Sequence, residues 1–255
     1  MQREYDMKVR EMFSIPLLKL KVEEDTDILH ECEDYIMSKV QVDTPTQARF
    51  MNGPEKYRIL EKYPDVRNTL MGYVRHAFHT MSYSCRFDIS TSWLTINKKG
   101  EHVQLHDHKN SFWSAVYYYG EYDGEGGELD IINPLPNLTS FRPNMRNINK
   151  YTTPFTRVTP MKKDLIIFPS YLMHSVNPVT SDIPRKSLAF NIVPIDNYGD
   201  ADSSMDSSGY SMFENIWKGQ MLSRFYVNME RYLQKQVQSI FAAAWMKFVT
   251  TAQYG

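Results

Sequence analysis

Residues 100–118, GEHVQLHDHKNSFWSAVYY, contain the pattern that decides how the rest of the chain is interpreted. His106 and His108 are one residue apart, and on a β-strand such side chains point to the same face of the sheet, so both imidazoles can reach one metal ion. A third histidine, His174, lies in another strand-like run, FPSYLMHSV, and Arg185 follows eleven residues later. We interpret these four residues as the centre of a functional site in a β-rich domain.

The composition is that of an ordinary soluble globular protein. Of the 255 residues, 42% are hydrophobic and 23% are charged, with a formal net charge of −1. Lys and Arg are not concentrated in any stretch, so there is no strong signal for nucleic acid or for an anionic membrane. The N-terminus lacks the apolar core of a signal peptide, and no apolar run could span a bilayer. With only Cys32 and Cys85, expected as free thiols, we predict a cytoplasmic protein.

The N-terminal third is predicted to form one strand and two helical regions. The strand lies within 12–22, where apolar and charged side chains alternate, and the helices cover about 25–40 and 54–82, with a break near Pro64. Residues 41–53 are predicted to be a loop. One apolar stripe marks the second helical region: Val66, Leu70, Tyr73, Val74, Ala77 and Met81. The helix histidines His30, His76 and His79 are expected to be surface or packing residues.

From Arg86 onward short alternating runs follow one another, separated by turn-forming clusters such as DGEGG, NPLPN and SDIPR. Because no helix of crossover length is interleaved, a parallel sheet is unexpected, and an all-β barrel or sandwich is favoured. The predicted fold class is therefore mainly β with flanking helices (α+β). The domain covers 1–195, with its barrel core at about 86–195.

The C-terminal part is predicted to be separate from the barrel. Residues 196–210 are polar and turn-forming and are interpreted as a linker. Over 211–255 apolar residues recur every four positions, which predicts a long helical extension that packs on the barrel or on its copy in a homodimer. The long, Pro- and Asn-containing stretch 133–155 is a candidate substrate loop.

The four residues of the opening pattern meet the needs of a mononuclear non-haem iron site. Such a site takes three protein ligands on one face of the metal and leaves positions for a chelating co-substrate and dioxygen. An anionic co-substrate needs a bidentate cation, which Arg provides better than Lys, and Ser187 lies on the same strand face as Arg185. With seven histidines in the chain an H-x-H can arise by chance, so the pattern gains its weight from His174 and Arg185.

At this point the sequence resembles the putative 2-oxoglutarate- and Fe(II)-dependent oxygenases, in the branch whose first motif is H-x-H. The matching stretches lie between about residues 12 and 194: FSIPLLKLKV, SWLTINKKGEHVQLHDHKNSFWSAVYY, GGELDI and KKDLIIFPSYLMHSVNPV…RKSLAFNI. The resemblance implies a double-stranded β-helix, a cupin-like jelly-roll barrel with helices outside it.

The resemblance also implies residue roles. His106 and His174 would be metal ligands, Arg185 would bind the distal carboxylate of 2-oxoglutarate, and Ser187 would assist it. For the middle ligand the wider superfamily has an acid at the position of His108; we favour His108, with Asp107 as the alternative if a bulge rotates the strand. Tyr117 and Asn97 are further candidates for the co-substrate pocket, with aromatic packing and turn capping as their competing roles.

The implied activity is that of a hydroxylase, an oxidoreductase that uses Fe(II), 2-oxoglutarate and O2 and forms succinate and CO2. Its substrate, a small molecule or a peptidyl group, is not identified by the sequence. Several aromatic residues could line the barrel mouth or belong to its core: Trp113, Tyr118, Tyr119 and Tyr171.

The sequence leaves two alternative functions open. One is a cupin-type metal dioxygenase or isomerase without 2-oxoglutarate, which fits the spacing of Gly100 to His108 but normally adds a glutamate after H-x-H and has no need of Arg185. The other is a non-catalytic, oligomeric β-barrel that binds a ligand.

Overall fold

The computed structural model describes residues 11, 13–24, 28–31, 33, 49–50, 57–135, 144, 146–195, 199 and 202. The chain divides into two compact units, Met1–Pro194 and Ile195–Gly255, and all the helices and strands named below lie in the first. The predicted helix over 211–255 and the homodimer expected through it lie outside the described residues. The same holds for the predicted linker, apart from Gly199 and Asp202.

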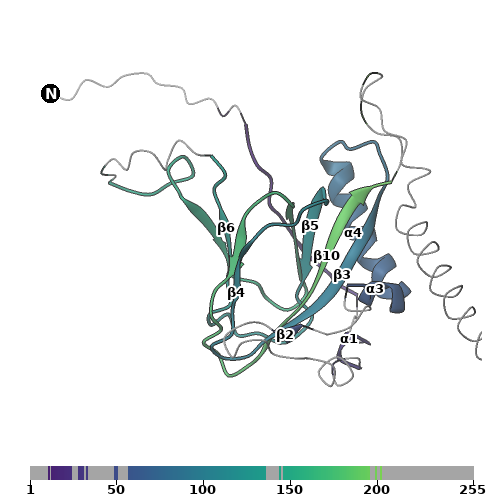
Figure 1. Cartoon of the computed structure of the whole chain (residues 1–255), viewed down its shortest axis with the longest axis horizontal. Helices are drawn as coiled ribbons and strands as arrows, with labels where there is room; N and C mark the ends of the chain where they lie inside the picture. The colour runs from purple at the N-terminus through teal and green to yellow at the C-terminus, as the bar shows by residue number, and fades with distance from the viewer. Residues whose placement is uncertain are drawn as a thin grey trace, which may run out of the picture. The chain divides into compact units, whose positions relative to one another are not determined.

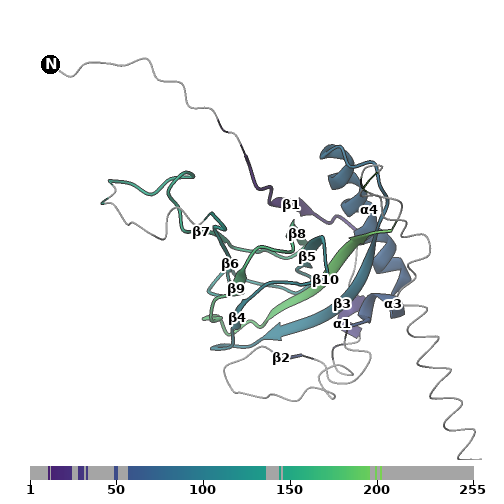
Figure 2. The same ribbon diagram turned by 45° about the horizontal axis from the view of Figure 1, so that its top comes forward.

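Two antiparallel sheets form the first unit, and they face each other as two layers in Figure 1 and Figure 2. The larger sheet has the order β1 (Leu18–Lys21), β8 (Asp164–Pro169), β5 (Trp113–Tyr117), β10 (Arg185–Pro194), β3 (Phe87–Asn97) and β2 (Arg49–Phe50). The smaller sheet has the order β4 (Val103–His106), β9 (His174–Val176), β6 (Leu129–Ile132) and β7 (Phe155–Val158). This confirms the mainly β class that the alternating runs predict.

From β3 to β10 the chain alternates between the two sheets. Successive strands change sheet at every step except β6 to β7, which pair within the smaller sheet. As a result, strands that are distant in sequence become neighbours: β4 pairs with β9, and β10 lies between β3 and β5. This crossing pattern brings the histidine-bearing segments together.

In the described part of the chain three helical segments lie before β3. They are α1 (Ile28–Glu31), α3 (Ile59–Lys62) and α4 (Pro64–Thr80), so the predicted break near Pro64 is confirmed. Proline is well suited to the first turn of α4, where its missing N–H has no intrahelical partner. The prediction of a loop over 41–53 is wrong at Arg49–Phe50, which pair with β3 as β2.

The helices cover the face of the larger sheet that is turned away from the smaller one (Figure 2). The predicted stripe of α4 is buried at Val66, Leu70, Val74 and Ala77, in one cluster with Leu94 of β3 and Phe190 of β10. A second cluster lies between the sheets and includes Tyr118, Ile131, Ile166, Phe168 and Val176. The central strands β5 and β8 therefore contribute alternate side chains to two different interiors.

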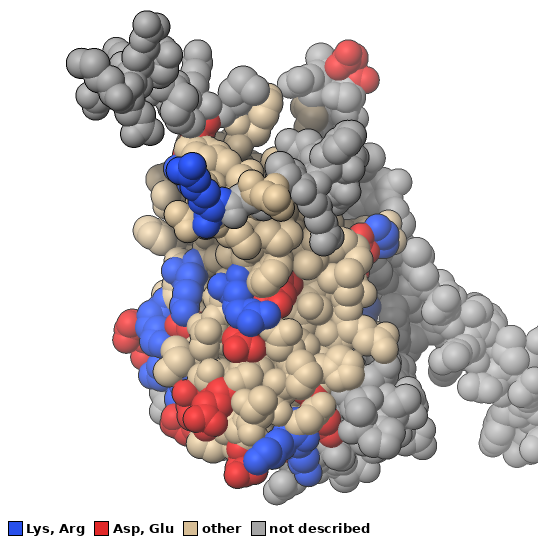
Figure 3. Space-filling model, turned by 90° about the vertical axis from the view of Figure 1, so that its left-hand side faces the viewer, with Lys and Arg blue, Asp and Glu red and all other residues tan. Residues whose placement is uncertain are grey.

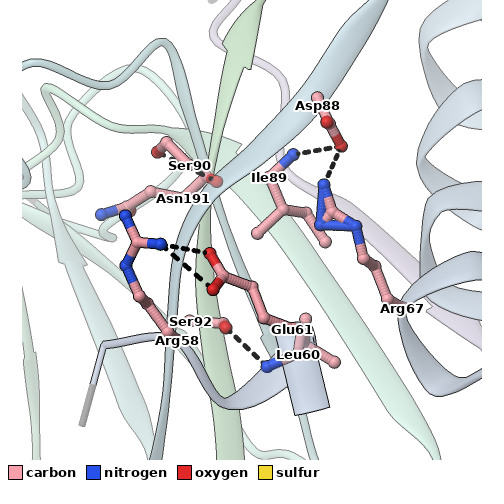
Figure 4. A network of polar contacts seen from close by, with 9 residues as sticks. All are labelled: Arg58, Leu60, Glu61, Arg67, Asp88, Ile89, Ser90, Ser92 and Asn191. Atoms are coloured by element: carbon pink, nitrogen blue, oxygen red, sulfur yellow. Dashed lines mark hydrogen bonds and ion pairs between the residues drawn. The ribbon is translucent and has the colours of Figure 1, made fainter. Parts of the chain in front are cut away.

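Polar contacts fix the helices to β3 (Figure 4). The backbone N–H of Leu60 donates to Oγ of Ser92 at 2.9 Å, within α3 and β3 respectively. Arg67 of α4 forms an ion pair with Asp88, whose Oδ1 also accepts the N–H of Ile89 at 2.8 Å. These contacts hold the helical layer against the strand that starts the alternating part of the fold.

The charges on the face that includes β6 are of both signs. In Figure 3 Lys and Arg side chains are intermixed with Asp and Glu around a broad area without charged residues. No helix among the described residues is long and apolar enough to cross a membrane.

Candidate metal and carboxylate-binding site

Three histidines converge between the two sheets. His106 is the last residue of β4 and His174 is the first of β9, and the two are direct partners in the antiparallel pair. With His108 they offer one ring nitrogen each, and these three atoms all lie within 4.8 Å of one another. Among the described residues this is the only group of three or more His, Cys, Asp or Glu side chains that could hold a metal ion.

His108 reaches this group from outside the strand. The sequence pattern places both histidines on one strand, but β4 ends at His106, after a register irregularity between Val103 and His106. The backbone N–H of His108 instead donates to the carbonyl oxygen of Ser170 at 3.1 Å. Its ring still lies 5.1 Å from that of His106 and 5.0 Å from that of His174, measured between ring centroids.

The Nδ1 atom of each imidazole is already hydrogen-bonded to an oxygen that can only accept. His106 Nδ1 donates to the carbonyl of Gln104 at 2.7 Å and His174 Nδ1 to that of Leu172 at 2.8 Å, each two residues earlier in the chain. His108 Nδ1 donates to Oδ1 of Asn191 at 2.6 Å. Each ring is thereby held with its proton on Nδ1, which leaves the Nε2 lone pair for a metal.

Burial keeps two of these imidazoles neutral. His174 is 4% exposed, and burial, reinforced by the nearby His106, lowers its pKa to about 3. Burial also lowers the pKa of His108 below its ordinary value. Since only the neutral imidazole can bind a metal, burial favours the ligating form of both residues at neutral pH.

Asp107 lies apart from the histidine group. Its carboxylate forms an ion pair with Lys109, and the hydrogen bond from that lysine lowers the pKa of Asp107. The group of possible metal ligands includes His108 and does not include Asp107. The geometry therefore favours the histidine among the two alternatives for the middle position.

Arg185 is buried at the start of β10, with 2% of its surface exposed. Its Nη1 donates to Oδ1 of Asn97 and to Oγ of Ser187, both at 3.2 Å, and its Nη2 donates to the hydroxyl of Tyr118 at 3.0 Å. All three acceptors are neutral. No Asp or Glu in the described part of the chain forms an ion pair with this guanidinium, and its Nε has no hydrogen-bond partner there.

Tyr117 and Tyr118 lie on opposite sides of the larger sheet, and Tyr118 contacts Arg185. Tyr117, a candidate for the co-substrate pocket, packs in the cluster that faces the helices, which corresponds to the competing role in aromatic packing. Tyr118 points into the space between the sheets, where it accepts the bond from Arg185 and lies 4.8 Å below the guanidinium, from ring centroid to Cζ. Burial raises the pKa of Tyr118, so its hydroxyl stays neutral.

The other aromatic residues and histidines that the sequence singles out lie in different parts of the fold. Trp113 and Tyr119 pack with the helices, and Tyr171 is 59% exposed. His30 bonds Glu33, while His76 and His79 are exposed on α4. Asn97 is fully buried and accepts a hydrogen bond from Arg185.

Two residues near the histidines have no role in the sequence-based prediction. The ring of Trp93 lies 5.3 Å from that of His108, and Asn191 binds His108 directly. A signal for Asn191 is present, because it follows Arg185 and Ser187 on β10 at even spacing and therefore shares their strand face. Trp93 has no such signal, since its contact with His108 depends on where the chain turns after β4.

The segment that contains these residues resembles known proteins. The model of a family described as putative 2OG-Fe(II) oxygenase matches residues 91–191. No curated protein matches the chain. Among solved structures, EvdMO1 is similar with a TM-score of 0.50 at 16% identity, over 70% of this chain and 47% of that one, and this likeness concerns the fold alone.

Other similar structures score lower. HygX from Streptomyces hygroscopicus, solved with nickel, 2-oxoglutarate and hygromycin B, has a TM-score of 0.47 at 12% identity over 71% of this chain and 83% of that one. A prolyl-4-hydroxylase from Pseudomonas putida has a TM-score of 0.43 at 15% identity over 70% of this chain and 93% of that one. Residues 91–191, the segment that carries the three histidines and Arg185, match the model of the putative 2OG-Fe(II) oxygenase family.

Proposed function

We propose that the protein is an Fe(II)- and 2-oxoglutarate-dependent dioxygenase that hydroxylates a small molecule or a peptidyl group. His106, His108 and His174 would hold Fe(II), and Arg185 would bind the distal carboxylate of 2-oxoglutarate with help from Tyr118, Ser187 and Asn97. We further propose that β3 to β10 form a double-stranded β-helix, which the alternation of strands between the two sheets supports.

The donor set fits Fe(II). Imidazole nitrogen is a good ligand for this ion, and three protein ligands leave positions for a bidentate co-substrate and for dioxygen. Because an imidazole binds a metal as a neutral group, the protein would add no negative charge to the metal. One carboxylate of 2-oxoglutarate would bring a negative charge to Fe(II) while the distal carboxylate would neutralise Arg185, so the site favours a dianionic co-substrate.

Buried Arg185 is the observation that carries the proposal. A guanidinium removed from water is costly unless an anion faces it, and here its described partners are neutral oxygens. The free Nε of Arg185 and the free Nδ2 of Asn97 are buried donors that a carboxylate would satisfy. At Gly127 an added Cβ would lie 2.9 Å from Cδ of Arg185, so the backbone leaves the side chain of Arg185 just enough room.

When bound, Fe(II) would supply the redox chemistry that places one oxygen atom of O2 in succinate, with release of CO2, and the other in a substrate C–H bond. The protein's own contribution is to position the metal and the co-substrate and to exclude water. Phe168 packs against the ring of His174 and shares the interior cluster with Tyr118, so apolar side chains lie beside both the histidines and Arg185. Such surroundings strengthen the charge interactions of the site.

The cupin-type reading is less well supported. It calls for a glutamate beside the histidines, and no Glu of the described residues belongs to the metal-binding group. It also leaves the buried, unneutralised Arg185 without a purpose.

The test is an anaerobic titration of the protein with Fe(II) and 2-oxoglutarate, which should develop the weak visible charge-transfer band of the chelate. Arg185→Ala should still bind Fe(II) but should weaken 2-oxoglutarate by about 100-fold, as expected for loss of a buried charge-assisted pair. Arg157→Ala is the matched control, because Arg157 pairs with Asp130 elsewhere, at 2.7 Å. The proposal fails if the wild type forms no band, or if the two variants behave alike.

A further inference from the structure

One histidine of the proposed metal site is held differently from the other two. The Nδ1 atoms of His106 and His174 are fixed by backbone carbonyls two residues earlier. His108 lies beyond the end of β4, and its Nδ1 is fixed by a side chain from the other sheet, Asn191 of β10. The orientation of this ring therefore depends on a partner that one substitution can remove.

The amide of Asn191 is itself oriented by its neighbours. On β3, Thr91 is the direct partner of Asn191, and Oγ1 of Thr91 accepts a hydrogen bond from Nδ2 of Asn191 at 3.0 Å. On β5, Ser114 is its partner on the other side, and Oγ of Ser114 donates to Oδ1 of Asn191 at 3.0 Å. In this arrangement the carbonyl oxygen of Asn191, rather than its NH2 group, faces His108.

A chain of hydroxyl groups supports this arrangement. Oγ of Ser114, which is 1% exposed, also lies 3.1 Å from Nδ1 of His108 and 2.8 Å from Oγ of Ser170. Ser170 donates in turn to Oγ of Ser111 at 3.0 Å, and Ser111 donates to the carbonyl of Trp113 at 3.0 Å. Because Ser114 gives its single proton to Asn191 and Ser170 gives its proton to Ser111, neither hydroxyl donates to Nδ1 of His108, and the Nδ1 proton of His108 goes to Asn191.

The orientation of the amide has a chemical consequence. An oxygen facing Nδ1 requires the proton of the neutral imidazole on Nδ1 and frees Nε2, whereas an NH2 group there would require the opposite tautomer and would place the proton where the metal binds. A register irregularity in the β10–β3 pair falls between Asn191 and Ile192, at the point where this side chain leaves the strand. Irregularities of this kind often re-aim a side chain beside a functional site.

We propose that Asn191 is a positioning residue that holds His108 in the Nδ1–H tautomer and thereby sets the affinity of the three-histidine site for a divalent metal. The inference rests on the proposed function, since it assumes that His108 is a ligand. The neutral amide of Asn191 would orient His108, the proposed ligand that lies beyond the end of β4.

The first measurement needs no metal. Ring ¹⁵N chemical shifts of the metal-free protein report the tautomer of each histidine, and wild-type His108 should carry its proton on Nδ1. In Asn191→Ala a substantial fraction should shift to the Nε2–H form, while His106 and His174 stay unchanged. In Asn191→Asp a carboxylate oxygen still accepts the Nδ1 proton, so the wild-type tautomer should return.

The second measurement is the affinity for Co(II), followed by its visible absorption at neutral pH. Asn191→Ala should lower the affinity for Co(II) by about 10- to 100-fold, the usual effect of removing the hydrogen-bond partner of a metal ligand. Asn191→Asp should recover most of this affinity. Asn177→Ala is the matched control, because that asparagine donates to Asp130 at 3.1 Å and not to a histidine. Its Co(II) affinity should equal that of the wild type.

The outcomes separate the two proposals. If the wild type binds no Co(II), the proposed function and this inference are both wrong. If the wild type binds Co(II) but Asn191→Ala binds it equally well and keeps the Nδ1–H tautomer, only the inference is wrong. Equal losses in Asn191→Ala and Asn191→Asp would assign Asn191 a purely structural role through Thr91 and would also overturn it.

Discussion

His106 and His174 stand opposite each other in the β4–β9 pair, with their ring centroids 4.3 Å apart. The two residues belong to strands that are far apart in sequence, and the pairing of those strands alone makes them neighbours. Each ring is anchored at Nδ1 by its own backbone, so the pair forms a rigid half of the histidine group.

Removal of either histidine of this pair should abolish tight metal binding. His174→Ala leaves two imidazoles, and we expect the affinity for Fe(II) or Co(II) to fall by more than about 100-fold, beyond the usual loss on removing an outer partner. Metal content after anaerobic loading and desalting measures this. His76→Ala, at an exposed position on α4, is the control and should retain one ion per chain; comparable loss in both variants would contradict the assignment.

The middle ligand can be decided by two neighbouring substitutions. His108→Ala should lose the metal, whereas Asp107→Ala should keep it, because the Asp107 carboxylate is engaged by Lys109. Iron content of the two variants, prepared in parallel, gives the comparison. Retention of iron by the first variant and loss by the second would mean that the acid is the ligand.

The two adjacent tyrosines should differ in their effect on co-substrate binding. Tyr118→Phe removes the oxygen that accepts from Arg185, which should weaken 2-oxoglutarate several-fold and leave metal affinity unchanged, since a buried donor that loses its acceptor costs roughly 1–3 kcal/mol. Tyr117→Phe is the matched control on the helix-facing side of β5. Isothermal titration of the metal-loaded variants with 2-oxoglutarate distinguishes them. A larger loss of affinity in Tyr117→Phe would restore the original assignment.

Acid should destabilise the metal-free protein through His174. Its pKa is lowered to about 3 in the fold, so the unfolded chain, with an ordinary histidine pKa of about 6.5, binds the proton first as pH falls. The stabilisation is complete above about pH 6.5 and is lost progressively below it. From pH 7 to pH 5 the free energy of unfolding should fall by about 2 kcal/mol from this residue alone.

Urea denaturation in the presence of a chelator, at several pH values between 7 and 5, checks this dependence. The comparison is with His174→Ala, which should be less stable at every pH. Its free energy of unfolding should fall by about 2 kcal/mol less than that of the wild type between pH 7 and pH 5. An equal slope in both proteins would assign the pH dependence to other groups.

Local regularities in the sequence were sufficient for much of the fold. The alternating runs after Arg86 predict the strands, and Pro64 marks the break between α3 and α4, because both features act on the backbone within a few residues. Even spacing along a strand likewise predicts that Ser187 shares a face with Arg185, and the contact between them at 3.2 Å agrees.

Other features depend on where each strand ends and which strand it meets. Tyr117 and Tyr118 are equivalent in the sequence, and only the packing of β5 between two different interiors assigns one to the helices and the other to Arg185. His108 faces the other two histidines although β4 ends before it, because Asn191 of β10 and Ser170, which follows β8, hold it there. The sequence by itself determined the candidate ligands and the cation beside them. Tertiary structure alone decided which neighbours orient them, because those contacts join strands from opposite sheets and no local periodicity encodes such a meeting.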